Sequence, residues 1–148
     1  MPLVDVVDDT FVRAAPAAVR AMTRPAWEGW LDAGPGARLA LVRAEERGVE
    51  GVRWEATART GRGRGSVRWA GTAEVWLEPA WGGTVVHLFV RLDPVPPVGP
   101  VGPVSGVSPA GGVPVPARHA RRLPDALRRS WKRGLVGVQV DPTAGPRS

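Results

Sequence analysis

The chain has 148 residues, of which 43% are hydrophobic, and this is enough for one domain with a packed core. It contains no cysteine, which excludes disulfides and thiolate metal sites, and no apolar run approaches the ~20 residues that a membrane-spanning helix requires. The net charge is +6, yet nineteen of the twenty basic residues are arginine, a skew that codon bias explains better than a nucleic-acid surface does. The acidic start lacks the basic region of a signal peptide, and we therefore expect a cytoplasmic protein.

The first third of the chain predicts a strand and two short helices. Apolar residues alternate over residues 3–12, which is the period of a strand with one buried face. Residues 14–22 predict a helix with a proline in its first turn, and residues 25–31 predict a second helix. Trp27 and Trp30 of this second helix are three residues apart and share a face. Core packing is their default explanation, and a lid over the mouth of a cavity is the alternative.

Four further strands are predicted over the middle of the chain. Residues 38–45 and 49–59 predict two of them, and residues 66–93 predict the other two as one long hairpin with two adjacent glycines in its turn. One face of this hairpin is purely apolar: Ala73, Val75, Leu77, Val86, Leu88 and Val90. Residues 60–65 are rich in Arg and Gly, and we interpret them as a turn rather than as a nucleic-acid-binding segment.

The last third combines a Pro/Gly-rich segment with a helix. Residues 94–116 hold eight prolines and five glycines in 23 positions, which predicts a flexible insertion with local polyproline II character. Residues 117–138 predict a helix with one apolar stripe, made of Leu123, Leu127, Trp131, Leu135 and Val138. Pro124 predicts a helix start or a kink, and Gly134 predicts an interruption with fraying beyond it.

A strand, two short helices, a run of antiparallel strands and a long C-terminal helix follow one another in the order of a helix-grip fold, which belongs to the α+β class. We expect residues 1–140 to form one domain and residues 141–148 to be a disordered tail. Six segments carry a family resemblance: 9–12, 15–19, 27–30, 47–54 (RGVEGVRW), 71–79 (GTAEVWLEP) and 85–88. In these segments the chain resembles an actinobacterial branch of the polyketide cyclase/dehydrase group, within the START-like (SRPBCC) superfamily.

The resemblance implies a curved antiparallel sheet wrapped around the C-terminal helix, with a hydrophobic cavity between them. Members of this group bind or carry lipids, polyketides and similar apolar molecules, and some catalyse ring closure or dehydration. Our interpretation is a protein that binds a small hydrophobic, lipid- or polyketide-like molecule by burying it against apolar and aromatic side chains. The expected lining residues are Trp54, Trp69, Val75, Leu77, Val86, Leu88, Leu127 and Trp131. No cofactor, metal site or membrane span is expected, and the sequence does not indicate an oligomeric state.

Two alternative functions stay open. If Glu78 pairs opposite Val85 in the hairpin, then Glu74, His87 and Arg91 share one face. A carboxylate beside an imidazole can form a general base, and an arginine can hold a developing enolate, as in an aromatase/cyclase-like enzyme. The simpler interpretation is that this face is the outer, half-solvated side of the sheet and that its charges form a ladder. The second alternative is a basic protein that binds nucleic acid through the arginines of the C-terminal helix, a partner that the charge skew disfavours.

Overall fold

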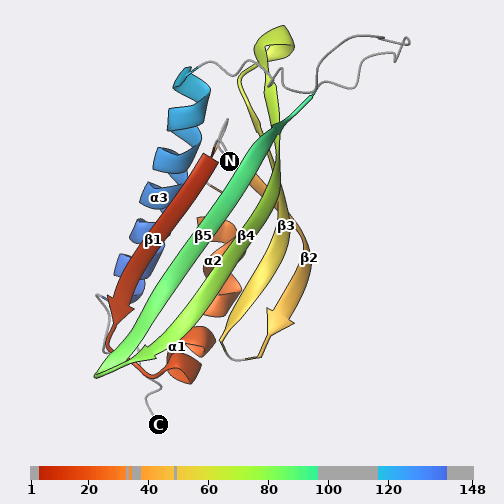
Figure 1. Cartoon of the computed structure of the whole chain (residues 1–148). Coiled ribbons are helices and arrows are strands. Elements are labelled where there is room, and N and C mark those ends of the chain that lie inside the picture. Colours follow the sequence, from red (N-terminus) through yellow and green to blue (C-terminus); the bar gives the residue numbers. More distant parts are fainter. Residues whose placement is uncertain (1–3, 33, 35–37, 49, 97–116, 140–148) are drawn as a thin grey trace.

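The alternating stretches of the sequence form one five-stranded antiparallel sheet in the order β1-β5-β4-β3-β2 (Figure 1). The structure is a computed structural model that describes residues 4–32, 34, 38–48, 50–96 and 117–139. The strands are β1 (Val4–Val12), β2 (Leu39–Arg47), β3 (Gly51–Thr60), β4 (Val67–Ala80) and β5 (Gly83–Val95). The helices are α1 (Pro16–Thr23), the 3-10 helix η1 (Arg24–Ala26), α2 (Trp27–Trp30), the 3-10 helix η2 (Gly63–Gly65) and α3 (Ala117–Gln139). The expected helix-grip arrangement of an α+β fold is confirmed.

The central hairpin of β4 and β5 has the register that the sequence predicted. Glu78 pairs with Val85, and Trp76 pairs with His87. Burial alternates along both strands. Successive side chains of a strand point to opposite faces, so every second side chain points toward the helices. The turn between the two strands contains Gly82 with a φ of 81°, a conformation that glycine adopts without steric cost. The purely apolar face of this hairpin is therefore the inner face of the sheet.

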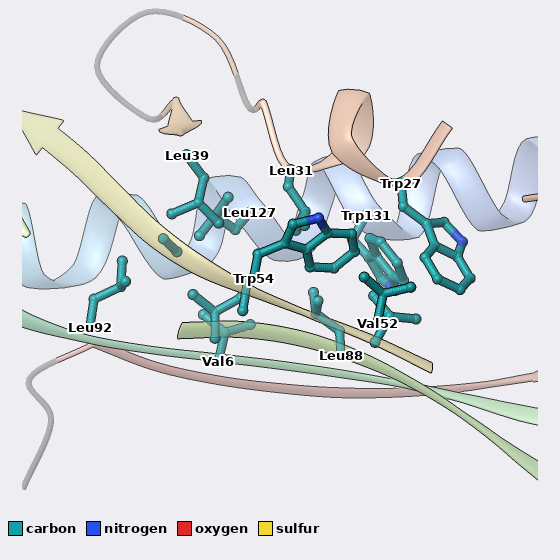
Figure 2. Packing of buried hydrophobic residues seen from close by; sticks show 14 of the residues in the cluster. Val6, Trp27, Leu31, Leu39, Val52, Trp54, Leu88, Leu92, Leu127 and Trp131 are labelled. Carbon is teal, nitrogen blue, oxygen red and sulfur yellow. The ribbon is translucent and has the colours of Figure 1, made fainter. Parts of the chain in front are cut away.

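The core lies between this inner face and the helices (Figure 2). Every strand contributes to it, together with α1, α2 and α3. Its largest fully buried side chains are the tryptophans Trp27, Trp54, Trp69 and Trp131. Burial of Trp131 against the sheet was predicted, and the burial of Trp27 agrees with core packing as its default role.

Helix α3 runs unbroken through two residues that the sequence predicted to interrupt it. Its apolar stripe is buried at Leu123, Leu127, Trp131 and Leu135, and half-buried at Val138. Pro124 lies inside the helix rather than at its start, and the buried stripe on both sides of it holds the helix together despite the lost backbone donor. Gly134 does not end the helix either. The ring of Trp30 occupies the place where a side chain of residue 134 would lie, so that a small residue is required there.

Two predicted segments lie outside the described residues: most of the Pro/Gly-rich insertion (97–116) and the C-terminal tail (140–148). Strand β5 runs on into the start of the insertion, since Pro94 pairs with Trp69 of β4. None of the helices in the described ranges is long and apolar enough to cross a bilayer.

Candidate functional site

The eight residues predicted to line a cavity all lie on the inner side of the fold. Each is at most 1% exposed, and all belong to one cluster that β3, β4, β5 and α3 build together. Figure 2 shows Trp54, Leu88 and Trp131 pointing into the layer between the sheet and α3. The other members of the set are Trp69, Val75, Leu77, Val86 and Leu127. The structure therefore brings all eight into one apolar layer, where they pack as core.

Two tryptophans of this layer have no partner for the indole N–H. Nε1 of Trp54 and Nε1 of Trp131 are buried, and neither finds an acceptor in the part of the chain that the structure describes. The other two fully buried tryptophans each donate to a buried threonine Oγ1: Trp27 to Thr23 (2.8 Å) and Trp69 to Thr60 (2.9 Å). An unpaired buried donor costs about 1–3 kcal/mol. Two such donors in one layer need an explanation, and a missing acceptor is the simplest.

Helix α2 covers both unpaired indoles. Trp27 meets Trp54 edge to face, with ring centroids 6.4 Å apart and planes at 82°. Trp30 meets Trp131 in the same way, at 5.4 Å and 83°. Contacts of this kind contribute about 0.5–1.5 kcal/mol beyond the burial of area. The i, i+3 spacing of the two tryptophans thus places one ring against the sheet and the other against α3, and α2 bridges the two walls of the interior.

A network of ion pairs joins α1 and η1 to β2, the edge strand of the sheet that lies farthest from β1. Arg24 donates to Glu46 over 2.9 Å, and Arg20 pairs with the same carboxylate. Hydrogen bonds from Arg24 and Arg20 hold the pKa of Glu46 below its ordinary value. The guanidinium carbon of Arg24 also lies 5.4 Å from the ring centroid of Trp27 and 5.5 Å from that of Trp54. Sequence reasoning missed this network, because its partners are more than twenty positions apart.

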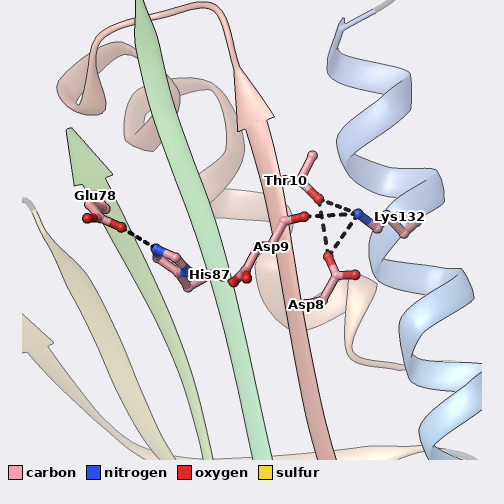
Figure 3. Close-up of polar contacts among 6 residues, drawn as sticks. All are labelled: Asp8, Asp9, Thr10, Glu78, His87 and Lys132. Atoms are coloured by element: carbon pink, nitrogen blue, oxygen red, sulfur yellow. Dashed lines mark hydrogen bonds and ion pairs between the residues drawn. The ribbon is translucent and has the colours of Figure 1, made fainter. Parts of the chain in front are cut away.

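The three residues predicted as a catalytic group lie on the outer face, but the structure does not bring them together. His87 is held between two other carboxylates: Nδ1 lies 2.5 Å from Oδ1 of Asp9, and Nε2 lies 2.7 Å from Oε2 of Glu78 (Figure 3). Arg91 pairs with an aspartate of β1, 3.7 Å away. Among the described residues, no hydrogen bond or ion pair joins Glu74 to His87 or to Arg91. These pairs agree with the interpretation of this face as a charge ladder.

The surroundings of His87 favour its charged form. Partial burial lowers the pKa of His87, but the hydrogen bonds to Glu78 and Asp9 and the charges of these carboxylates outweigh it, so that the pKa is raised above its ordinary value. In the charged form both ring nitrogens are donors, so that this form cannot accept a proton as a general base. The group ties β1, β5 and β4 together. No set of three or more His, Asp and Glu side chains in the described ranges could hold a metal ion.

The single lysine of the chain ties α3 to the edge strand β1. Nζ of Lys132 donates to Oγ1 of Thr10 over 2.7 Å and to the backbone oxygen of Asp9 over 3.2 Å (Figure 3). It also lies 3.2 Å from a carboxylate oxygen of Asp8, whose side chain is only 10% exposed. These contacts cover an edge strand that would otherwise be open to pairing. Sequence patterns in a short window do not predict a contact between residues that are 122 positions apart.

Described residues line two surface hollows outside this interior. One, of about 440 Å³, is on the outer side of α3 and is lined by Asp8, Arg128, Arg129, Lys132 and Arg133. Arg128 lies 4.0 Å from Asp125, and Lys132 pairs with Asp8, so acids partly balance the basic side of the helix. This weakens the helix as a nucleic-acid surface. The other hollow, of about 350 Å³, lies on the sheet and is lined by Arg38, Ala40, Thr57, Ala58, Arg59, Arg68, Trp69, Ala70 and Val95.

Comparisons with known proteins do not assign the chain to a family. No protein-family model matches the chain, and no curated protein matches it. Similar solved structures include TTHA0849 from Thermus thermophilus, with 14% identity and a TM-score of 0.41 over 90% of this chain and 98% of that one. The di-domain ARO/CYC StfQ from the steffimycin biosynthetic pathway has 18% identity and a TM-score of 0.44, over 96% of this chain and 52% of that one. Ara h 8.0201 has 11% identity and a TM-score of 0.43, over 93% and 97%. At such low identities and TM-scores we take no family, no ligand and no activity from them.

Proposed function

We propose that this protein binds a small, mostly apolar molecule that carries a hydrogen-bond acceptor, in the interior between the sheet and α3. The observation that carries this proposal is the pair of buried indole N–H groups, on Trp54 and Trp131, that find no acceptor among the described residues in an otherwise apolar layer. A carbonyl, hydroxyl or ether oxygen of a ligand would accept from them. The body of the ligand would be stabilised by burial, at about 25 cal/mol per Å² of apolar surface. Lipid- and polyketide-like molecules combine these two properties.

The polar groups of the interior indicate that the buried part of the ligand is neutral. Among the described residues, the buried polar residues besides tryptophan are Thr23, Thr60 and Thr84. No charged residue is buried as a whole, although Nη1 of Arg20 is buried without a partner. Each threonine already has a partner: Thr23 and Thr60 accept from tryptophans, and Thr84 donates to the backbone oxygen of Ala14 over 2.6 Å. The charge of Arg20 is already balanced by Glu46, so an ionised ligand group would find no uncompensated counter-charge among the described residues, and its burial would be costly.

Entry of the ligand would require α2 to move, because this helix lies over both unpaired indoles. The helix has only four residues and is held by aromatic contacts and by the exposed Arg24–Glu46 pair. Exposed ion pairs contribute only about 0–1 kcal/mol. We therefore assign α2 the lid role that the spacing of Trp27 and Trp30 suggested, in addition to core packing. Lid motions of this kind occur on the microsecond to millisecond timescale.

A matched pair of ligands tests the proposal. 2-Acetylnaphthalene and 2-ethylnaphthalene have nearly the same shape, and only the first carries a carbonyl oxygen. Titration calorimetry should show that the wild type prefers the ketone by about fivefold or more, because one net hydrogen bond contributes about 1 kcal/mol.

The matched variants are Trp54→Phe, Trp131→Phe and, as a control, Trp27→Phe. All three remove an indole N–H, but that of Trp27 is already bonded to Thr23. We expect the preference for the ketone to shrink in the first two variants and to persist in the control. Failure of the wild type to bind either naphthalene, or a preference that is untouched in Trp54→Phe and Trp131→Phe, would contradict the proposal.

A further inference from the structure

The second surface hollow lies on the outer face of the sheet, where β3 and β4 approach the turn that joins them. In Figure 1 this turn lies at the end of the sheet opposite to α1. Small apolar side chains, Ala40, Ala70 and Val95, form part of its lining, and Thr57 adds a hydroxyl. Three arginines, Arg38, Arg59 and Arg68, complete its charged side. The hollow therefore combines apolar surface with an unusual concentration of guanidinium groups.

Two of these arginines form a like-charge pair. Arg59 and Arg68 are directly opposite each other in the register of β3 and β4, and both are exposed. Like charges at directly opposed positions destabilise a sheet. Arg38 has an acidic partner, Asp32, at 3.1 Å, but no ion pair within the described residues reaches Arg59 or Arg68. The pair thus stands at a position where an anion from outside would be stabilising.

The acidic residues that the structure describes do not neutralise this end of the sheet. One acidic residue on the same face, Asp93, pairs with Ala70, two residues along β4 from Arg68, and forms no ion pair with Arg68 among the described residues. The turn that follows β3 adds two exposed arginines, Arg62 and Arg64, around η2. Outside the described ranges the sequence contains a single acidic side chain, Asp141.

We propose that this hollow binds a phosphate group, carried by a small organic molecule or by a lipid head group. The planar forks of two neighbouring guanidinium groups match the oxygens of a phosphate, to which each can donate two hydrogen bonds. The hydroxyl of Thr57 supplies one more donor, and the alanine and valine side chains accept the carbon body next to the phosphate. A volume of about 350 Å³ is at the lower end of the range for ligand pockets. This site is separate from the interior, for which we propose a neutral ligand.

The test compares two double variants that lose the same charge. Arg59→Gln/Arg68→Gln removes the unpaired arginines of the hollow. Arg43→Gln/Arg91→Gln, the control, removes two exposed arginines of the sheet that already have acidic partners, at 3.6 and 3.7 Å. Titration calorimetry with phenyl phosphate, and with benzyl alcohol as the uncharged probe, measures binding to the full-length chain. Sedimentation with phosphatidylcholine vesicles, with and without phosphatidic acid, measures binding to a head group.

We expect phenyl phosphate to bind the wild type, and benzyl alcohol not to bind at the same concentration. The Kd of phenyl phosphate should rise at least about tenfold in Arg59→Gln/Arg68→Gln and change less than about twofold in the control, because hydrogen bonds to charged groups are stronger than those between neutral groups. Binding to phenyl phosphate without binding to the vesicles identifies a soluble phosphate as the source. Binding to phosphatidic acid vesicles that the Arg59/Arg68 variant loses identifies a head group, and both outcomes support the site.

Three results would overturn the proposal. Binding of the phosphate probes could weaken equally in both double variants, it could be unchanged in Arg59→Gln/Arg68→Gln, or the wild type could bind neither phosphate probe. Tight binding of a single-stranded oligonucleotide with a steep salt dependence, when phenyl phosphate does not bind, would replace it by a nucleic-acid surface. The variant should fold, because it relieves a like-charge pair, and its melting temperature should not fall below that of the wild type. Unchanged binding of 2-acetylnaphthalene by the variant would show that the interior is intact. Should the double variant fail to fold, Arg68→Gln alone serves in its place.

Discussion

Replacing Gly134 by alanine probes the contact that holds α2 against α3. At an exposed position inside a helix, this change stabilises by about 1 kcal/mol, because alanine has the higher helix propensity. At Gly134 the new Cβ would lie 2.5 Å from Nε1 of Trp30 and nearer still to two carbons of the same ring. The ring has little freedom to retreat, since it packs against the fully buried Trp131 at 5.4 Å. We therefore expect a loss of stability where propensity alone predicts a gain.

Gly137 of the same helix is the matched control, because a Cβ there would meet nothing within 4 Å. The gain in helix propensity is similar at the two positions, so the difference between the two variants isolates the contact with Trp30. Overpacking of a well-packed site costs about 1–3 kcal/mol. We expect Gly134→Ala to be about 1–3 kcal/mol less stable than Gly137→Ala, at about 2–4 °C of melting temperature per kcal/mol for a chain of this size.

Urea unfolding, followed by circular dichroism and by tryptophan fluorescence, measures both variants in the wild type and in a Trp30→Ala background. Without the ring, Gly134→Ala should no longer be destabilising, and the double-mutant cycle should give a coupling of about 1–3 kcal/mol. Equal stabilities of Gly134→Ala and Gly137→Ala, or a penalty that persists in the Trp30→Ala background, would refute this account of the α2–α3 contact.

Two further predictions concern His87 and the insertion. The pKa of His87 is raised in the folded state, so protonated His87 stabilises the fold fully below the unfolded pKa of about 6.5, and this contribution is lost as the pH rises through the folded pKa. His87→Gln should therefore remove one step from the dependence of stability on pH, and an NMR titration midpoint of the His87 ring below 6.5 would contradict the assignment. Replacing residues 97–116 by about ten Gly/Ser residues should leave the melting temperature within a few degrees, because the entropy of loop closure changes slowly with length. A large drop would show that the segment packs against the domain.

Local periodicity carried the prediction of the fold. The hairpin register from Glu78 and Val85, the buried stripe of α3 and the inner face of β4 and β5 all follow from alternation or from spacings of three and four, which are visible in a short window of sequence. The eight expected lining residues reached the interior for the same reason, because each lies on the apolar side of its own element.

Contacts between distant segments could not be predicted in this way. Pro124 and Gly134 are poor helix residues, yet the buried stripe and the ring of Trp30 override their local preference. His87 was expected beside Glu74 because they share a face. Its partners are instead Asp9, from a strand 78 positions away, and Glu78, whose side chain reaches back along β4. The unpaired indoles could be found only by accounting for every buried donor, which requires coordinates.

The indole N–H resonances of ¹⁵N-labelled protein test the proposed interior site most directly. Trp→Phe variants assign the signals of Trp27, Trp54, Trp69 and Trp131, and 2-acetylnaphthalene is then titrated to saturation. We expect the indole protons of Trp54 and Trp131 to shift downfield as they donate to the ketone, while those of Trp27 and Trp69, already bonded to threonines, stay nearly unchanged. Unshifted resonances of Trp54 and Trp131 at saturation, or equal shifts of all four, would contradict a ligand held by the two unpaired indoles.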